Sequence, residues 1–350
     1  MSVLKAAGTS GIILLTLFST SGRSFGPSLE ATSAQIGVFC NCESGAQRSL
    51  QKSVMQLQSD LLNWTGFRKP GQIHSSKLGW VHNVQKSIFE IVYPKGKAVI
   101  WHLPAPAMQT NNEWVNLQIK NCLNQKISNC PIFAEKGDGT AWLTGNSSTL
   151  ATAAHTIHHW VKTTLNDNPS LSLAQIRIPV LLYKNKVLVK TSGEAMLDAS
   201  DSDRSYWTTT PQDTDEDFAK EFIKISLDAP LNAKPLVMAH NTQLTDQSRT
   251  YEIGYPNSTH VFAKIGAKDA PGRVLVISSG KPMEVPGYPK QNLNGERLQF
   301  TNAEYFGGSG SPVLNSNGQV IGMVIAGMIE PVEASVVLNI NWLNANFSKH

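Results

Sequence analysis

After Cys130 the chain consists of short runs of β-branched, aromatic and leucine residues, separated by Gly, Asn, Asp or Pro. Many short runs with regular turn signals, and almost no helical periodicity between them, are typical of a β-barrel or β-sandwich. Roughly 215 residues lie beyond Pro131, which is enough for two small barrels packed together. The predicted strands are 141–144, 178–183, 187–190, 222–225, 250–253, 273–277, 320–325 and 335–338.

The N-terminus has the three-part layout of a secretory signal peptide. Lys5 is followed by the mostly apolar stretch 6–18 and then by small polar residues. We expect residues 1–25 to be removed, with cleavage somewhere from 21 to 26; the alternative is a buried N-terminal helix. Later apolar runs are all shorter than the ~20 residues that span a bilayer, so no stable membrane anchor is expected after signal removal. The sequence therefore predicts a secreted or periplasmic protein.

The composition excludes one class of partner. With 41% apolar and 16% charged residues, the chain has the composition of a folded globular protein. Its net charge is +4, and loss of Lys5 and Arg23 with the signal lowers this to +2. Nucleic-acid binding needs a clustered basic face, so we expect no nucleic-acid partner.

Export changes the interpretation of the four cysteines. In an oxidising compartment an even number of cysteines favours disulfides. Cys40 and Cys42 are poorly placed to bond each other, so we expect each to pair with one of Cys122 and Cys130, in either order. A zinc site is the alternative, although Cys-x-Cys and Cys-x7-Cys are not the usual structural-zinc spacings.

Residues 26–130 are predicted to form an α+β N-terminal extension. Apolar residues at three- and four-residue steps predict a helix over 49–62, and the runs 88–93 and 98–103 predict a hairpin. The polar, proline-containing stretch 104–113 is the candidate linker. Two interpretations stay open: a propeptide that is removed, or a permanent accessory segment, which the expected disulfides favour.

Two segments carry the chemistry. Ser309 lies in the glycine-rich turn Gly307-Gly-Ser-Gly-Ser-Pro312, and such a turn can expose a nucleophilic hydroxyl while backbone amides converge on an oxyanion. Upstream, a strand of small residues ends in Thr152-Ala-Ala-His155. Together the two segments resemble the chymotrypsin-like (trypsin-fold) serine proteases, and the serine turn is similar in style to that of the secreted bacterial glutamyl endopeptidases.

The resemblance implies two antiparallel Greek-key β-barrels with a short C-terminal helix, within a domain at 131–350. It implies that Ser309 is the nucleophile, that His155 is the general base, and that the amides of Gly307 and Ser309 form the oxyanion hole. The order His before Ser fits this family. An α/β-hydrolase has Ser first and needs Gly-x-Ser-x-Gly, which Ser311 breaks.

The family places its acid in an Asp-x-Ala motif that leads into a strand. Asp217-Phe-Ala matches this motif, so the resemblance implies Asp217 as the third member of the triad. Two residues, Lys220 and Glu221, separate the motif from the next apolar run, where the family continues at once with apolar residues. Asp215 and Asp213 are therefore the alternatives.

The resemblance also places a specificity pocket. Ala303 falls at its base with Glu304 beside it, and Ile325 and Gly327 lie in a wall. The family acts on protein or peptide substrates and requires no metal or organic cofactor.

His155, His158 and His159 also suggest a metal site. The chain contains no His-Glu-x-x-His motif, so no metal is expected there. His158 and His159 are instead expected at the start of a short helix.

The sequence thus predicts a secreted serine endopeptidase that works through a His-Asp-Ser triad and an acyl-enzyme. The alternative is a catalytically inert protein that keeps the trypsin fold and binds a partner. The irregular motif at Asp217 is the support for this second hypothesis.

Overall fold

The computed structural model describes residues 78–95, 99–102, 113–127, 129–185, 187–198, 203–209, 220–240, 243–256, 274–284, 293, 295–302, 307–328, 334–341 and 344. The signal peptide, the helix predicted at 49–62, the linker up to 112 and the first two cysteines lie outside these residues. Among the described residues, no helix combines the length and apolar character needed to cross a membrane.

Strands dominate the described residues. They are β1 (Ile88–Pro94), β2 (Val99–His102), β3 (Asn129–Ile132), β4 (Lys136–Leu143), β5 (Thr149–Ala153), β6 (Arg177–Lys184), β7 (Val187–Asp198), β8 (Phe222–Ser226), β9 (Thr250–Gly254), β10 (Val276–Gly280), β11 (Arg297–Phe300), β12 (Pro312–Leu314), β13 (Val320–Met328) and β14 (Ala334–Asn339). The helices are α3 (Val81–Val84), α4 (Glu113–Asn124), α5 (His158–Asp167) and α6 (Arg204–Thr208), with 3₁₀ turns at Gln85–Ser87, Ala154–Thr156 and Leu173–Gln175.

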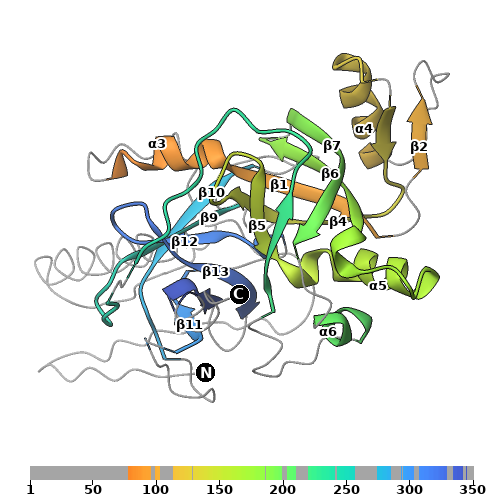
Figure 1. Ribbon diagram of the computed structural model, residues 1–350. Coiled ribbons are helices and arrows are strands. Elements are labelled where there is room, and N and C mark those ends of the chain that lie inside the picture. The colour runs from red at the N-terminus through yellow and green to blue at the C-terminus, as the bar shows by residue number, and fades with distance from the viewer. Residues whose placement is uncertain are drawn as a thin grey trace, which may run out of the picture.

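The first six-stranded body is a closed antiparallel barrel (Figure 1). Its order is β1-β4-β5-β8-β7-β6, and β6 pairs with β1 to complete the circle. The barrel is filled by fully buried aliphatic side chains such as Leu143, Leu150, Val180 and Ile225. Burial of these side chains supplies the main driving force for closing the barrel.

The second body is a six-stranded sheet that curls until its edges meet. Its order is β10-β9-β12-β13-β14-β11. Beyond β10, Pro282 pairs with Phe300 of β11, and the amide of Met283 donates to the carbonyl of Gln299 at 3.0 Å. These contacts join the segment that directly follows β10 to β11 at the opposite edge, so this sheet also closes on itself there.

The two barrels share one topology. Lettered a to f along the chain, the six strands of each barrel follow the same cyclic order, a-b-c-f-e-d. The repeated order confirms the predicted all-β fold of two antiparallel Greek-key barrels.

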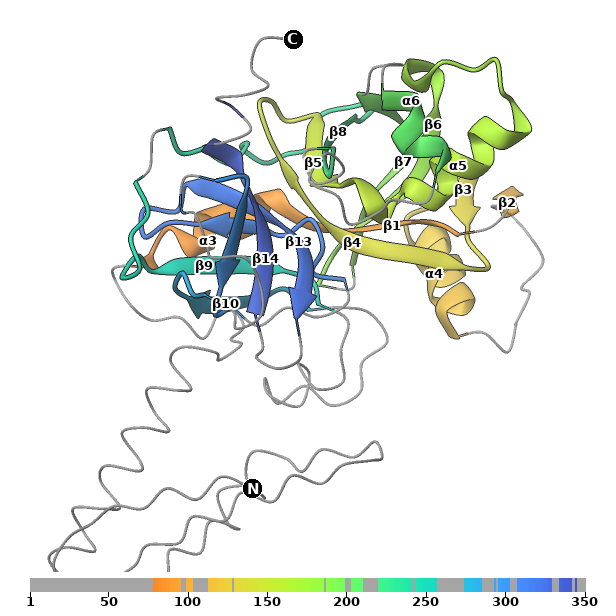
Figure 2. The same cartoon turned by 90° about the horizontal axis from the view of Figure 1, so that it is seen from below.

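The barrels pack directly on each other (Figure 2). Trp142 and Ala151 of the first barrel and Ile253, Tyr255 and Leu314 of the second belong to one buried cluster. Because this cluster is continuous, the position of each barrel is fixed relative to the other.

The hairpin predicted at 88–103 is wrong. β1 pairs with β4 and β6, whereas β2 pairs with β3. All seven residues of β1 are buried, so this strand needs neighbours at both edges and cover on both faces, which a two-stranded hairpin does not provide. The first barrel therefore begins at Ile88, well before the boundary predicted at residue 131.

Residues before β1 pack on the second barrel. The indole Nε1 of Trp80 donates to the carbonyl of Ser316 at 3.0 Å, and its ring meets Tyr251 edge to face. Val81 of α3 is fully buried in the cluster between the barrels. The segment from Leu78 to Pro94 thus runs from the second barrel into the first.

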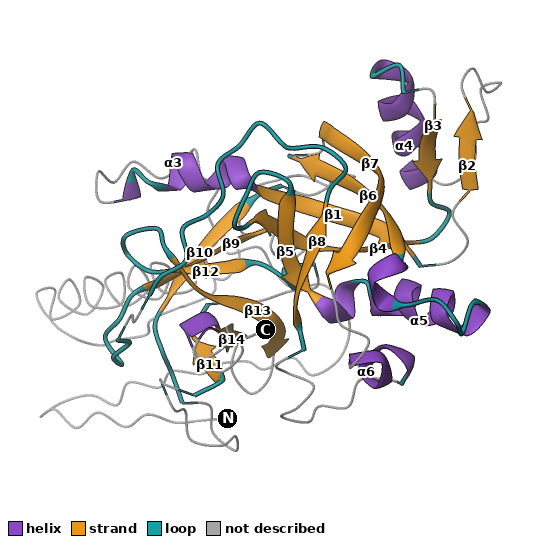
Figure 3. Cartoon of the chain, in the orientation of Figure 1, coloured by secondary structure: helices purple, strands orange, loops and turns teal. Residues whose placement is uncertain are grey.

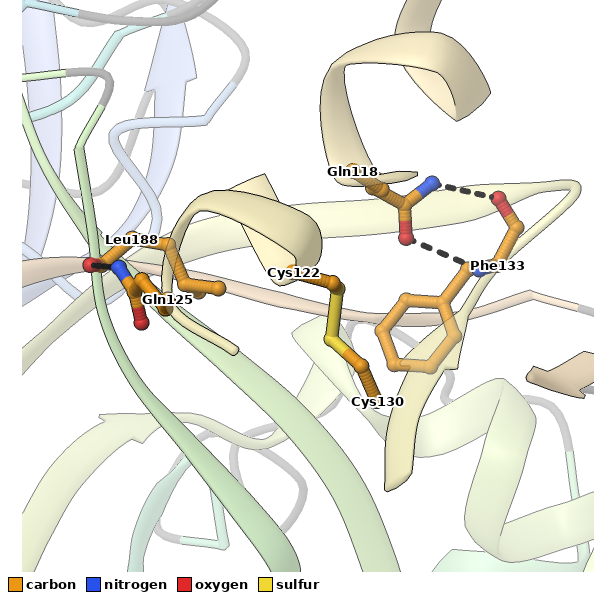
Figure 4. Close-up of a disulfide and its surroundings, with 6 residues drawn as sticks. All are labelled: Gln118, Cys122, Gln125, Cys130, Phe133 and Leu188. Atoms are coloured by element: carbon orange, nitrogen blue, oxygen red, sulfur yellow. Dashed lines mark hydrogen bonds between the residues drawn. A yellow bond between two sulfur atoms is a disulfide. The ribbon is translucent and has the colours of Figure 1, made fainter. Parts of the chain in front are cut away.

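Between β1 and β4 the chain leaves the barrel to form β2, α4 and β3 (Figure 3). Helix α4 was not predicted from the sequence. Both groups of the Gln118 side chain bond the backbone of Phe133 at 2.9 Å, the amide as donor to its carbonyl and the oxygen as acceptor from its amide (Figure 4). This paired contact fixes α4 against the segment that leads into β4.

The disulfide differs from both predicted pairings. Cys122 of α4 is bonded to Cys130 of β3, and their Cα atoms are 6.0 Å apart (Figure 4). The prediction that these two cysteines pair with Cys40 and Cys42 is therefore wrong, because α4 folds back on β3 and brings its own cysteine within reach. The bridge fastens this inserted unit internally.

The end of the chain follows the prediction in part. β14 is the expected last strand, and Ile340 and Asn341 after it are helical. Most of the residues beyond them lie outside the part of the chain that the structure describes.

Candidate active site

His155 lies where β5 ends. β5 pairs with β8 as far as Ala153, which lies opposite Phe222, and the next amide, of Ala154, donates to the carbonyl of Glu221 at 2.8 Å. A single 3₁₀ turn then leads the chain out of the sheet. The register of two strands therefore places His155 beside the residue that precedes β8.

Both carboxylate oxygens of Glu221 are hydrogen-bonded. Oε2 lies 2.7 Å from Nδ1 of His155 and accepts from the His155 amide at 3.2 Å. Oε1 accepts from the hydroxyl of Tyr206 at 2.9 Å. The Glu221 side chain is 10% exposed and that of His155 is 36% exposed, so the acid is covered while the imidazole reaches solvent.

These contacts fix the charge of the acid and the orientation of the ring. Burial by itself would raise the pKa of Glu221. The hydrogen bonds and charge of His155, together with the hydroxyl of Tyr206, outweigh the effect of burial and hold this pKa below its ordinary value of 4.5. An ionised carboxylate has no proton to donate, so the hydrogen of this bond is on Nδ1 of His155. Nε2 is then the ring nitrogen that is turned away from the acid.

Ser309 lies in a turn that requires glycine. Gly307 and Gly310 have φ of +91° and +87°, in the left-handed region that side chains disfavour. A Cβ on Gly310 would lie 2.2 Å from the carbonyl oxygen of Thr140. The Gly310 amide donates to the carbonyl of Val324 at 2.8 Å, which fastens the turn to β13.

Thr140 of β4 holds the backbone of this turn. Its amide donates to the carbonyl of Ser309 at 2.9 Å, and its hydroxyl donates to the carbonyl of Gly307 at 3.1 Å. The same hydroxyl accepts from the amide of Tyr255 at 2.9 Å. Thr140 is fully buried, so these bonds do not compete with water.

The serine turn and the histidine meet at Gly139. A Cβ on Gly139 would lie 2.9 Å from the side chain of Thr156, the neighbour of His155, and 3.1 Å from the carbonyl oxygen of Ser309. Only a residue without a side chain allows this approach. The backbone of Ser309 and the turn that carries His155 therefore both approach Gly139, where the two barrels join.

The sequence profile of the trypsin-like peptidase domain matches residues 139–323. The match covers more than half of the chain and includes both the histidine strand and the serine turn. The chain belongs to the trypsin-like peptidase family. No curated protein matches its sequence.

Several solved protease structures are similar to this trypsin-like peptidase at low identity. The serine endoprotease from Yersinia pestis is 13% identical with a TM-score of 0.42, over 79% of this chain and 67% of that one. The Rv3671c protease from M. tuberculosis, active form, is 15% identical with a TM-score of 0.41, over 81% and 87%. The HtrA-type protease AlgW with decapeptide is 12% identical with a TM-score of 0.42, over 77% and 65%.

Among the described residues of this trypsin-like peptidase, the acid that bonds the imidazole is not one of the three predicted from the sequence. Asp217, Asp215 and Asp213 lie outside the described residues, and the carboxylate on Nδ1 of His155 is Glu221. One feature of the sequence indicates Glu221. Glu221 is the acidic residue that stands directly before the apolar strand at 222–225, where the family motif enters its strand.

The predicted specificity pocket is described only in part. Ala303 and Glu304 lie outside the described residues. Ile325 is 5% exposed and packs in the cluster of Ala153 between the barrels, whereas Gly327 is exposed.

The other two histidines begin α5, as predicted. His158 is buried, and its Nε2 bonds the carbonyl of Tyr206 at 2.9 Å. His159 is exposed. Within the described part of this trypsin-like peptidase, no group of three or more His, Cys, Asp and Glu side chains is arranged to hold a metal ion.

Proposed function

We propose that the chain is a serine endopeptidase whose triad is Ser309, His155 and Glu221. The observation that carries this proposal is the 2.7 Å contact between Nδ1 of His155 and Oε2 of Glu221, in a fold that also presents Ser309 in a turn whose glycines have positive φ. Membership of a peptidase family supports the same function. Glu221 takes the role that the sequence motif assigned to Asp217.

The reaction proceeds by acyl transfer. Nε2 of His155 takes the hydroxyl proton of Ser309 as Oγ bonds the carbonyl carbon of the substrate peptide. The tetrahedral intermediate collapses, its carbon–nitrogen bond breaks, and the leaving amine takes the proton from Nε2. Water, deprotonated by the same nitrogen, then hydrolyses the acyl-enzyme. Glu221 orients the ring and stabilises its cation throughout.

The amides of Gly307 and Ser309 are proposed to bind the oxyanion. Each donor of this kind contributes ~2.7–4 kcal/mol to the transition state. The bonds from Thr140 to the carbonyls of Gly307 and Ser309 support this role, since they hold the same backbone in one conformation. Metal and organic cofactors are not needed for these steps.

The substrate class follows from the family. We propose that protein or peptide segments bind beside the serine turn, with Ala303 and Glu304 at the base of the pocket for the P1 side chain and Ile325 and Gly327 along one wall.

The proposed location is secreted or periplasmic. The predicted signal at 1–25 supports it, and so does the disulfide between Cys122 and Cys130, since disulfides persist in oxidising compartments.

Labelling with a fluorophosphonate probe tests the proposal. We expect an adduct on the peptide that contains Ser309 and none in the matched variant Ser309→Ala, whose thermal midpoint should stay within a few degrees of the wild type. A well-folded wild-type protein that forms no adduct would instead support an inert binding protein of trypsin fold.

A further inference from the structure

We propose that Tyr206 is a positioning residue that holds Glu221 in the orientation His155 requires. The inference rests on the proposed function and concerns the short helix α6, which lies between β7 and β8 in the chain. It assigns a catalytic purpose to a hydroxyl that belongs to neither of the segments that resemble family motifs.

A glutamate needs more anchoring than an aspartate in this position. Its side chain has one more rotatable bond, so fixing it costs more conformational entropy. Contact with His155 through Oε2 alone would leave the Glu221 carboxylate free to swing about its longer stem. The bond from the Tyr206 hydroxyl to Oε1, 2.9 Å long and buried, fixes the other oxygen.

Tyr206 is itself held rigidly. The residue is 2% exposed, and its ring meets those of His158 and Trp207 edge to face, with centroids 5.5 Å and 5.2 Å apart. Its carbonyl accepts from Nε2 of His158 at 2.9 Å. Arg204 ties the start of α6 to the segment after α5 through a 2.7 Å bond to the carbonyl of Leu171.

The two helices form a support for the acid. α5 and α6 lie side by side next to the first barrel in both views (Figures 1 and 2). α5 starts directly after the turn that carries His155, and α6 carries the hydroxyl that binds Glu221. The two packed helices are therefore connected to His155 through the chain and to Glu221 through the hydrogen bond from Tyr206.

The hydroxyl also acts on the charge of the pair. A donor bonded to a carboxylate stabilises its ionised form, and such charge-assisted bonds are stronger than neutral ones. The ionised acid with a neutral imidazole carries a net negative charge, whereas the protonated pair is neutral overall. Loss of the donor destabilises the negative form more, so the pair will take up a proton at a higher pH.

The test compares Tyr206→Phe with Trp207→Phe. The first variant removes one hydroxyl and keeps the ring, while the second loosens the packing of the same helix and leaves the hydroxyl in place. For Tyr206→Phe we expect kcat to fall about tenfold with KM nearly unchanged, and the acid limb of the kcat/KM profile to move to higher pH. For Trp207→Phe, measured well below its thermal midpoint, we expect a wild-type pH profile.

Two outcomes would overturn the proposal. One is a Tyr206→Phe enzyme with wild-type kcat and pH profile; the other is a Trp207→Phe enzyme that reproduces both changes, which would make the effect one of packing. The Nδ1 proton of His155 gives a second readout by NMR, and we expect its resonance to move in Tyr206→Phe alone. This readout does not need turnover, so it separates failure of this proposal from failure of the proposed function.

Discussion

The Thr140 hydroxyl connects both barrels to the serine turn. It donates to the carbonyl of Gly307 and accepts from the amide of Tyr255, and all three groups are buried. Replacement by valine keeps the shape but leaves a buried donor and a buried acceptor without partners. We expect Thr140→Val to lower the free energy of unfolding by about 1–3 kcal/mol and to slow the labelling of Ser309 by a fluorophosphonate.

Thr140→Ser is the matched control because it keeps the hydroxyl and removes only a methyl group. Denaturant unfolding and fluorophosphonate labelling rates measure the two effects. Equal rates in Thr140→Val and Thr140→Ser would show that the hydroxyl does not position the turn.

Glu221 also makes the free energy of unfolding depend on pH. The folded pKa of Glu221 lies below its ordinary value of 4.5, because the contacts with His155 and Tyr206 outweigh the effect of burial. The stabilisation is therefore complete above pH 4.5 and is lost as the pH falls through the folded pKa. We expect the difference in unfolding free energy between wild type and Glu221→Gln to shrink as the pH falls below 4.5 and through the folded pKa of Glu221. A difference that grows as the pH falls below 4.5 would contradict an ionised Glu221.

His155 and Ser309 could be proposed from the sequence, whereas the carboxylate that bonds His155 could not. His155 and Ser309 stand in local motifs whose side chains are set by neighbours in sequence. The choice of Glu221 depends on the register of β5 against β8, which pairs Ala153 with Phe222 and follows from packing across the barrel. Asp217, four residues before Glu221, fits the family's Asp-x-Ala motif better. A local sequence pattern, however, does not show the register between two strands.

Among the structural elements, the serine turn depends most on one residue type. Gly310→Ala has to place its Cβ in the left-handed region, at ~1–2 kcal/mol, and also 2.2 Å from the carbonyl oxygen of Thr140. We expect it to lower the thermal midpoint strongly and to abolish labelling. Gly145→Ala is the control: its φ is +67°, and its Cβ would meet nothing within 4 Å. Similar losses of thermal stability in both variants would refute the steric argument.

Most strands were predictable because their apolar runs are local. The pairing of β1 was not predictable. The apolar run at 88–93 can pair with any strand in a sheet that is covered on both faces. Helix α4 is stabilised by contacts at a distance, including Gln118 on Phe133 and the bridge to Cys130. Such contacts leave little trace in the sequence of the helix itself.

At the scale of the whole molecule, β1 and the residues from Leu78 that precede it are part of the two-barrel body. Cleavage near Pro131 would remove β1 from a closed barrel, and with it the contacts of Trp80 and Val81 on the second barrel. We therefore expect N-terminal sequencing of the mature protein to place its start before Leu78. A start near Pro131 in an active, folded protein would contradict the role of β1.

In the proposed triad Glu221, and no other acid, orients His155 for reaction with Ser309. The test is the second-order rate constant for phosphonylation of Ser309 by a fluorophosphonate at neutral pH, in Glu221→Gln and in Asp217→Asn. An amide in place of the orienting carboxylate stabilises the wrong tautomer of the imidazole and lowers the rate by about 10⁴-fold in sites of this kind. We predict that loss for Glu221→Gln and a near wild-type rate for Asp217→Asn. The reverse pattern would restore Asp217 as the acid and contradict the proposed role of Glu221.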